Sequence, residues 1–289
     1  MADGSEIRIL CQSRPRQFAV LLTDDLIGFI ATSRHKEAPK LSGGLLTNLY
    51  SAMWKHRAAL NEIALYVGAY IFYFVTRDLV HSDAWAEGLI NGEKVMLLQR
   101  DLGFLWEPGW QSWALENVRP LVVAMNWVYI VTYWPVILLT AFILFLKNRR
   151  DYNFYRTVVL VNLTVAVVTF MIFPVASPFS IPGVELSDSI QEFGPRFYGS
   201  EGMSSYYNIS AAMPSLHFSW TVILGVLFWR SFPGRRRMMG LLYPVLTFFA
   251  ITLTGNHFIL DAIAGGLLAG MSFGLILLLR ALNPRLFSA

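Results

Sequence analysis

Residues 258–280 read FILDAIAGGLLAGMSFGLILLLR. A helix needs about twenty predominantly apolar residues to cross the hydrocarbon core of a bilayer. This run meets that requirement with one acidic residue, Asp261, near its beginning. Ionisable groups inside a span are costly and tend to mark function. The run therefore predicts a membrane-spanning helix that carries a functional carboxylate in its first turn.

Further apolar runs of similar length precede it in the chain. Hydrophobic residues make up 55% of the 289 residues and charged ones only 15%, with a mean hydropathy of +0.49. Such a composition excludes an ordinary soluble domain. We expect an all-α integral membrane protein, a bundle of about six transmembrane helices. Their predicted ranges are 58–76, 120–146, 156–175, 214–232, 238–254 and 258–280.

Lysine and arginine are distributed unevenly along the chain. Eighteen of the 23 lie before residue 58, in the turns 147–156 and 230–237, or from residue 280 onward, and five lie in the loops 77–119 and 176–213. These two loops also hold eleven of the 19 acidic residues. Because basic residues stay on the cytoplasmic side, we expect both termini in the cytoplasm and both long loops outside it. Orientation explains the basic turns, so we expect no nucleic-acid partner.

The remaining segments are predicted to lie outside the membrane core. Residues 1–57 form a cytoplasmic N-terminal segment, and residues 58–289 form one membrane domain, with no cleaved signal peptide expected. The loop 77–119 contains four tryptophans and spaced apolar positions, which predict short helices at the membrane interface. The loop 176–213 is rich in Pro, Ser, Gly and Tyr, which favours an irregular lid. The single cysteine, Cys11, excludes a cysteine metal cluster.

Apart from the arginines near the predicted cytoplasmic ends, four acidic or histidine side chains lie in or at the ends of the predicted spans, namely Glu62, His217, His257 and Asp261. The topology places both histidines at the outer face. Asp261 follows His257 by four residues, a spacing that puts both side chains on one face of a helix. A carboxylate that accepts a ring proton fixes the histidine tautomer and leaves the second ring nitrogen free to attack phosphorus. His217 then fits the acid that protonates a departing oxygen.

Pro214 and Ser215 stand at the start of the helix that carries His217. Backbone N–H groups are free at such a helix start and the helix dipole is positive there, so the position suits an anion. We expect a phosphate group to bind at this point. Ser215 is the candidate substrate-binding residue, because its hydroxyl can donate to a phosphate oxygen.

Other interpretations of these residues stay open. A histidine near a helix end is commonly an interfacial residue, and His257 with Asp261 can instead form a structural hydrogen bond between helices. Glu62 fits a packing or snorkelling residue. Two histidines can also be the axial ligands of a haem, and Asp261 can be the coupling carboxylate of a transporter or a residue of an inactive binding protein. Close helix packing is the expected role of Gly265, Gly266, Gly270 and Gly274.

Several motifs resemble those of a known family. Residues 213–217 (MPSLH) and 255–261 (GNHFILD) are similar to the second and third motifs of the type 2 phosphatidic acid phosphatase (PAP2) superfamily. Residues 173–179 (FPVASPF), 211–217 (AAMPSLH) and 254–257 (TGNH) resemble its branch of inositol phosphorylceramide synthases and sphingomyelin-synthase-like transferases. The resemblance extends over about residues 80 to 280.

The resemblance implies a six-helix bundle that acts on a membrane lipid. In this family's pattern His257 attacks phosphorus to form a phosphohistidine, His217 protonates the leaving alcohol, Asp261 orients His257, and Ser215 binds a phosphate oxygen. No metal and no organic cofactor is implied. The acceptor is either water, which makes a lipid phosphatase, or an alcohol such as a polyol or a second lipid, which makes a head-group phosphotransferase. The motif details favour the transferase.

Two basic positions of the family motifs are replaced in this chain. The first motif, a lysine followed by an Arg-Pro pair, is not recognisable, and Ile251 stands where the third motif has an arginine. Because a phosphoryl transition state is normally stabilised by a cation, we expect one of Arg100, Arg119 or Arg196 to supply it.

Overall fold

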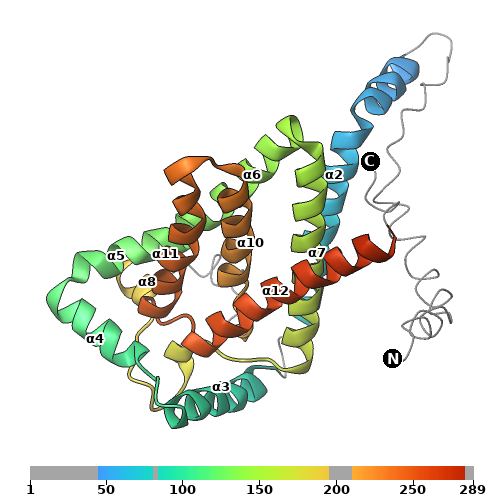
Figure 1. The fold of residues 1–289 in the computed structure, drawn as a ribbon. Helices are drawn as coiled ribbons and strands as arrows, with labels where there is room; N and C mark the ends of the chain where they lie inside the picture. The colour runs from blue at the N-terminus through green and yellow to red at the C-terminus, as the bar shows by residue number, and fades with distance from the viewer. Residues whose placement is uncertain (1–44, 81–83, 195–209, 284–289) are drawn as a thin grey trace, which may run out of the picture. The chain divides into compact units, whose positions relative to one another are not determined.

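The fold consists of helices, as the sequence predicts. The computed structural model describes residues 45–80, 84–194 and 210–283, and within these ranges it contains no β-strand, only an isolated parallel bridge between Val175 and Ala211. Figure 1 shows α2 (Leu45–Val80), α3 (Ala84–Asp101), α4 (Glu107–Asn117), α5 (Arg119–Trp127), η2 (Val128–Thr132), α6 (Tyr133–Lys147), α7 (Arg149–Ile172), η3 (Pro178–Ser180), α8 (Ser189–Phe193), α10 (Leu216–Ser231), η4 (Gly234–Met238), α11 (Met239–Leu253) and α12 (Ile259–Leu282).

Each of the predicted spans contains a helix, but the helices differ in length. In the described part of the chain four stretches are long and apolar enough to cross a membrane: His56–Thr76, Arg119–Lys147, Arg149–Ile172 and Ile259–Leu282. The second runs without interruption through α5, η2 and α6. The other two predicted spans are α10 and α11, of 16 and 15 residues. At 1.5 Å per residue each measures about 24 Å, somewhat less than the roughly 30 Å of a hydrocarbon core.

Residue contacts divide the chain into a large unit, Tyr66–Leu278, and a small one made of Met1–Leu65 and Leu279–Ala289. Within the large unit α10 packs along α11, the helix that follows it (Figure 1). Gly225 and Gly240 lie at their crossing, and a side chain on either glycine would collide with the backbone oxygen of the other. Small residues permit such close approach of two helices in a membrane. The predicted boundary between residues 57 and 58 stays a prediction.

A buried polar cluster joins three helices of the large unit. Asn162 of α7 donates hydrogen bonds to the hydroxyls of Ser219 on α10, at 2.7 Å, and Ser272 on α12, at 3.2 Å. Trp220 donates its indole N–H to the Asn162 oxygen at 3.1 Å. Polar side chains inside a bundle associate in this way because lipid offers them no partner. The cluster therefore has a structural explanation and fixes α7 against α10 and α12.

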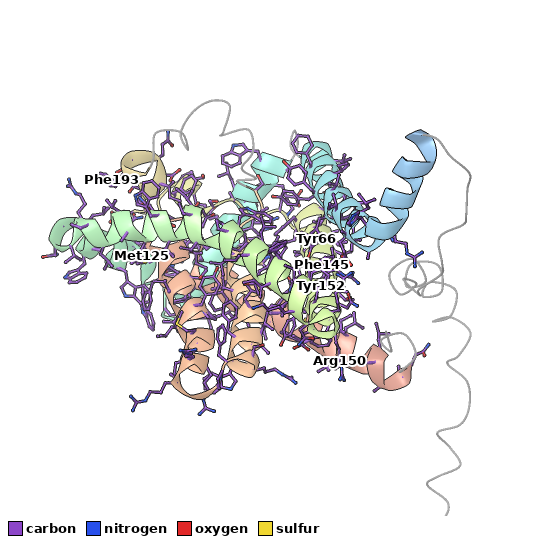
Figure 2. All side chains as sticks on the ribbon, turned by 90° about the horizontal axis from the view of Figure 1, so that it is seen from above. Tyr66, Met125, Phe145, Arg150, Tyr152 and Phe193 are labelled. Atoms are coloured by element: carbon purple, nitrogen blue, oxygen red, sulfur yellow. The ribbon has the colours of Figure 1, made fainter. Side chains whose placement is uncertain are left out.

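The α6–α7 turn is held by aromatic contacts. Figure 2 shows Phe145 and Tyr152 on the two sides of this turn, where their rings meet edge to face with centroids 5.3 Å apart. The guanidinium of Arg149 lies over the Phe145 ring. Tyr152 also donates a hydrogen bond to the hydroxyl of Tyr66 on α2 at 3.4 Å. The turn thus ties α2, α6 and α7 together.

Basic residues and the predicted outer helices lie at opposite ends of the large unit. The α6–α7 turn, with Arg149 and Arg150 exposed, and the α10–α11 turn lie at one end, and α3 and α4 lie at the other (Figure 1). The separation is the one that the distribution of charges predicts. Which end faces the cytoplasm stays a prediction.

Helices α3 and α4 occupy the loop for which short interfacial helices were predicted. Several large apolar side chains of these helices and of the turn between them are exposed, as a position at a membrane interface requires: Ile90, Leu98, Leu102, Trp106 and Trp113. In the second predicted loop, a short α8 follows an irregular stretch. Residues 195–209 of the predicted lid lie outside the described residues.

Candidate active site

The loop between α11 and α12 folds back on the end of α11. The Thr254 hydroxyl donates to Ala250 O at 2.8 Å, and His257 N donates to Ile251 O at 3.1 Å. Gly255 has a φ of +77°, and a side chain there would approach Ser187 O to 2.5 Å. Glycine is required for both reasons, since it alone adopts such a φ without strain and lacks a Cβ. The tight turn leaves the His257 side chain only 6% exposed at the start of α12.

Asp261 lies directly beside His257, as the spacing predicts. Its Oδ2 is 3.4 Å from Nδ1 of His257 and accepts a hydrogen bond from Phe258 N at 2.9 Å. Within the described residues, His257 Nδ1 and Asp261 Oδ1 are buried without a hydrogen-bond partner. Buried polar atoms rarely stay unpaired, and the exceptions include catalytic groups. The carboxylate therefore faces Nδ1 and leaves Nε2 of His257 for chemistry.

His217, in the first turn of α10, packs against two tyrosine rings. The Tyr129 ring stacks on the imidazole with centroids 4.3 Å apart, and the Tyr133 centroid lies 4.1 Å away. Tyr129 belongs to the π-helical segment η2, and Tyr133 begins α6 directly after it. Single π-helical turns are frequent at functional sites, because they re-aim side chains within a helix. Sequence reasoning missed both tyrosines, since aromatic residues four apart are ordinary in a spanning helix.

The two histidines meet although 40 positions separate them in the sequence. Their ring centroids are 6.2 Å apart, and the ring planes are inclined by 55°. Reacting groups approach a catalytic side chain to about 3 Å. Rings at this separation can therefore contact opposite sides of one small group such as a phosphoryl. The structure brings His217, His257 and Asp261 into a single site.

Ser215 caps α10 next to this site. Its hydroxyl oxygen accepts a hydrogen bond from Phe218 N at 3.3 Å, and its backbone N–H donates to Asp261 O at 3.0 Å. The residue is fully buried. It joins the start of α10 to the start of α12, so it positions His217 relative to Asp261. Contact between Ser215 and a phosphate stays a prediction.

Comparison with protein families gives one match. The model of the PAP2 superfamily matches residues 93–275, which is more than half of the 289-residue chain. The chain belongs to the PAP2 superfamily. Comparisons with curated proteins and with solved structures give no match. PAP2 proteins are membrane-embedded phosphatases and phosphotransferases, so the protein is a phosphoryl-transfer enzyme of an all-α membrane fold.

Three arginines, Arg100, Arg119 and Arg196, are the predicted sources of the cation that stabilises the phosphoryl transition state. Arg100 lies 3.5 Å from the carboxylate of its neighbour Asp101, with both side chains well exposed, and Arg119 lies over the ring of Phe193. Arg196 lies outside the described residues. We still predict that one of the three supports transition-state charge. Full activity in all three single alanine variants would contradict this.

The PAP2 match includes the second half of α3 and all of α4, and three buried polar side chains of these helices bind the backbone around His257. Gln99 accepts from Leu260 N at 2.8 Å, and Glu107 accepts from Ile259 N. Gln111 donates to Leu253 O at 3.0 Å. Each of the three side chains is at most 2% exposed: Gln99, Glu107 and Gln111. They hold both ends of the loop that carries the histidine.

Sequence reasoning gave no role to these three side chains. The local pattern around them, with its tryptophans and spaced apolar residues, indicates only a helix at an interface. Burial raises the pKa of the Glu107 carboxyl, and the hydrogen bonds that it accepts, including those from Gln99 and Ile259, oppose that rise. A carboxyl group this thoroughly enclosed and bonded is a fixed part of the site and not a surface charge.

Proposed function

We propose that this PAP2 protein is a lipid head-group phosphotransferase that works through a phosphohistidine on His257, similar to an inositol phosphorylceramide synthase. The observation that carries the proposal is the pairing of the His257 and His217 rings, 6.2 Å apart, above the buried Asp261. Its substrate is a membrane lipid phosphate or phosphodiester. Its acceptor is an alcohol, either a polyol or a second lipid.

In the first half-reaction Nε2 of His257 attacks phosphorus. The N–P bond forms as the P–O bond to the lipid alcohol breaks, and His217 gives its proton to the departing oxygen. The positive charge that develops on the His257 ring is stabilised by Asp261 at Nδ1. The products are the phosphohistidine, the released lipid alcohol and a neutral His217.

In the second half-reaction the acceptor alcohol takes the place of the departed one. Neutral His217 removes the proton of the acceptor hydroxyl while its oxygen attacks phosphorus and the N–P bond breaks. This step restores the protonated His217 and the free Nε2 of His257. Water in the same position would give hydrolysis, which is the phosphatase alternative.

The hydrogen bonds of the segment 173–179 support the interpretation of the protein as a transferase. Val175 N donates to Ser210 O and Ala212 N donates to Val175 O, both at 2.9 Å. Phe179 N donates to Gly255 O at 3.2 Å. Backbone hydrogen bonds therefore join this segment to both histidine-bearing motifs, which supports a site built from the three stretches that resemble the transferase branch.

The proposal is tested with purified full-length protein in detergent and lipids labelled with ³²P in the head group. Acid-labile label on wild-type protein that is absent from the His257→Ala variant, together with labelled product on an added alcohol, is the expected result. Labelled inorganic phosphate alone would establish the phosphatase alternative. Transfer at the wild-type rate by His257→Ala would overturn the proposal.

The same preparation separates the other interpretations. A Soret absorption band that is lost in both His217→Ala and His257→Ala would indicate a haem protein. A folded wild-type protein that turns over none of the lipids in the panel would indicate an inactive binding member. In the proposed mechanism the purified protein transfers phosphate, and both histidine variants lose that activity.

A further inference from the structure

We propose that Gln99 of α3 and Glu107 of α4 form a positioning pair that holds His257 in its reactive orientation. This inference rests on the proposed function, since it assigns the pair to the orientation of the proposed nucleophile. The pair is separated from the start of α12 by more than 150 positions in the chain. It consists of one amide and one carboxylate, both fully buried.

The contacts of the pair are specific. The Gln99 amide nitrogen donates to both carboxylate oxygens of Glu107, at 2.7 and 2.8 Å. Gln99 Oε1 accepts the backbone N–H of Leu260, and Glu107 Oε1 accepts that of Ile259 in addition to the Gln99 amide. The first N–H groups of a helix have no partner within the helix. Here residues from two other helices supply those partners.

The two capped positions lie between His257 and Asp261. The contact between these side chains depends on the backbone of this single turn, in which Phe258 N also binds the Asp261 carboxylate. Fixing Ile259 N and Leu260 N therefore fixes the angle at which the imidazole meets its carboxylate. A displacement of about 1 Å at a reacting group is enough to reduce a rate about a hundredfold.

The negative charge of Glu107 suits this place. The start of a helix carries a partial positive charge, and an anion near it is stabilised. In the described structure the Glu107 side chain acts as an acceptor in each of its hydrogen bonds. An amide at position 107 would turn one acceptor into a donor that faces the donor of Gln99, so the pair would open.

Exchanging the two side-chain types provides a sharp test. The single variants Glu107→Gln and Gln99→Glu place two amides or two carboxylates against each other. The double variant Gln99→Glu with Glu107→Gln restores one amide and one carboxylate, and each again offers an oxygen to Leu260 N or Ile259 N. The matched control is Glu116→Gln, the same change on an exposed residue of α4 whose partner is Ser112.

Two measurements are made on each full-length variant in detergent. The kcat of the ³²P transfer reaction should fall about ten- to a hundredfold in both single variants with little change in KM, and the double variant should recover to within about threefold. Amide hydrogen exchange of residues 258–262 should be faster in the single variants and return to the wild-type rate in the double variant. The control should match wild type in both.

Wild-type kcat in both single variants would overturn the inference, as would a double variant that restores exchange but not kcat. If the single variants fail to fold, the inference is tested with the double variant alone. A folded double variant with a kcat near wild type supports the positioning role, and a folded one with a low kcat contradicts it. Failure of the proposed function gives a different result. In that case the His257→Ala variant stays active, irrespective of the activities of the Gln99 and Glu107 variants.

Discussion

The imidazole of His257 has two neighbours of functional interest, a carboxylate and a second imidazole. Nδ1 faces the fully buried carboxylate of Asp261 at 3.4 Å, and the ring centroid of His217 lies 6.2 Å from that of His257. A carboxylate so placed sets the tautomer and stabilises the charged form of the ring, which a covalent bond to phosphorus would require. The roles proposed for the three side chains agree with these contacts.

Replacing Asp261 with asparagine should therefore abolish most of the activity. The amide keeps the shape of the side chain but removes the charge, so we expect kcat to fall about a hundredfold or more. The kcat is measured as the rate of phosphate transfer by the purified protein. Asp101→Asn, on an exposed carboxylate at the end of α3, is the control and should match wild type. An Asp261→Asn variant within a few-fold of wild type would exclude the orienting role.

The ring of Tyr129 should matter more than its hydroxyl. Stacked at 4.3 Å, the ring restricts the orientation of His217. Tyr129→Phe keeps that contact and should retain kcat within about twofold, whereas Tyr129→Leu should lower kcat about fivefold, since an aromatic contact contributes about 1 kcal/mol. Equal activity in the two variants would show that the ring does not position His217.

Among the elements, α12 depends on one close contact with the start of α10. A side chain at Gly265 would collide with the carbonyl oxygen of Ser215, while Gly270 and Gly274 face open space. The prediction that all the glycines of this helix serve close packing is therefore wrong for the last two. The actual close approaches are at Gly265 and at the Gly225–Gly240 crossing, because they depend on where partner helices cross.

Gly265→Ala and Gly270→Ala make a matched pair of substitutions on one helix. We expect Gly265→Ala to lower both the thermal midpoint and the kcat, because the added methyl separates α12 from Ser215. Gly270→Ala should leave kcat unchanged and can raise stability by up to about 1 kcal/mol, since alanine favours a helix. Thermal unfolding in detergent measures both. Similar midpoints for the two variants would contradict this account of the α10–α12 contact.

The large unit, Tyr66–Leu278, has two basic turns at one end and the short helices α3 and α4 at the other. Labelling tests its predicted orientation. With Cys11 replaced by serine, a cysteine introduced at the exposed Asp101 in α3 should react with an impermeant maleimide on intact cells. A cysteine at Arg236, in the α10–α11 turn, should react only after permeabilisation. The reverse pattern would place the site on the cytoplasmic side.

Much of the fold was accessible from composition and local pattern. All six apolar runs contain helices, and the spacing of four residues predicts the contact of His257 with Asp261, although α12 begins only at Ile259 and His257 lies just before it. Spans 214–232 and 238–254 were predicted longer than α10 and α11 turned out to be, because hydropathy measures apolar length and not where turns begin. The packing role predicted for Gly270 and Gly274 is wrong for a related reason, since the residues around a glycine do not indicate where another helix crosses it.

The amino-acid sequence by itself determined the membrane character, the helical class and the two histidine-bearing helix ends, because each depends on residues close together in the chain. Tertiary structure alone decided that His217 meets His257, that Tyr129 and Tyr133 pack on His217, and that Gln99 and Glu107 bind the first turn of α12. Those contacts join residues far apart in the chain. They form only when the helices pack against one another, so no local periodicity or spacing in the sequence predicts them.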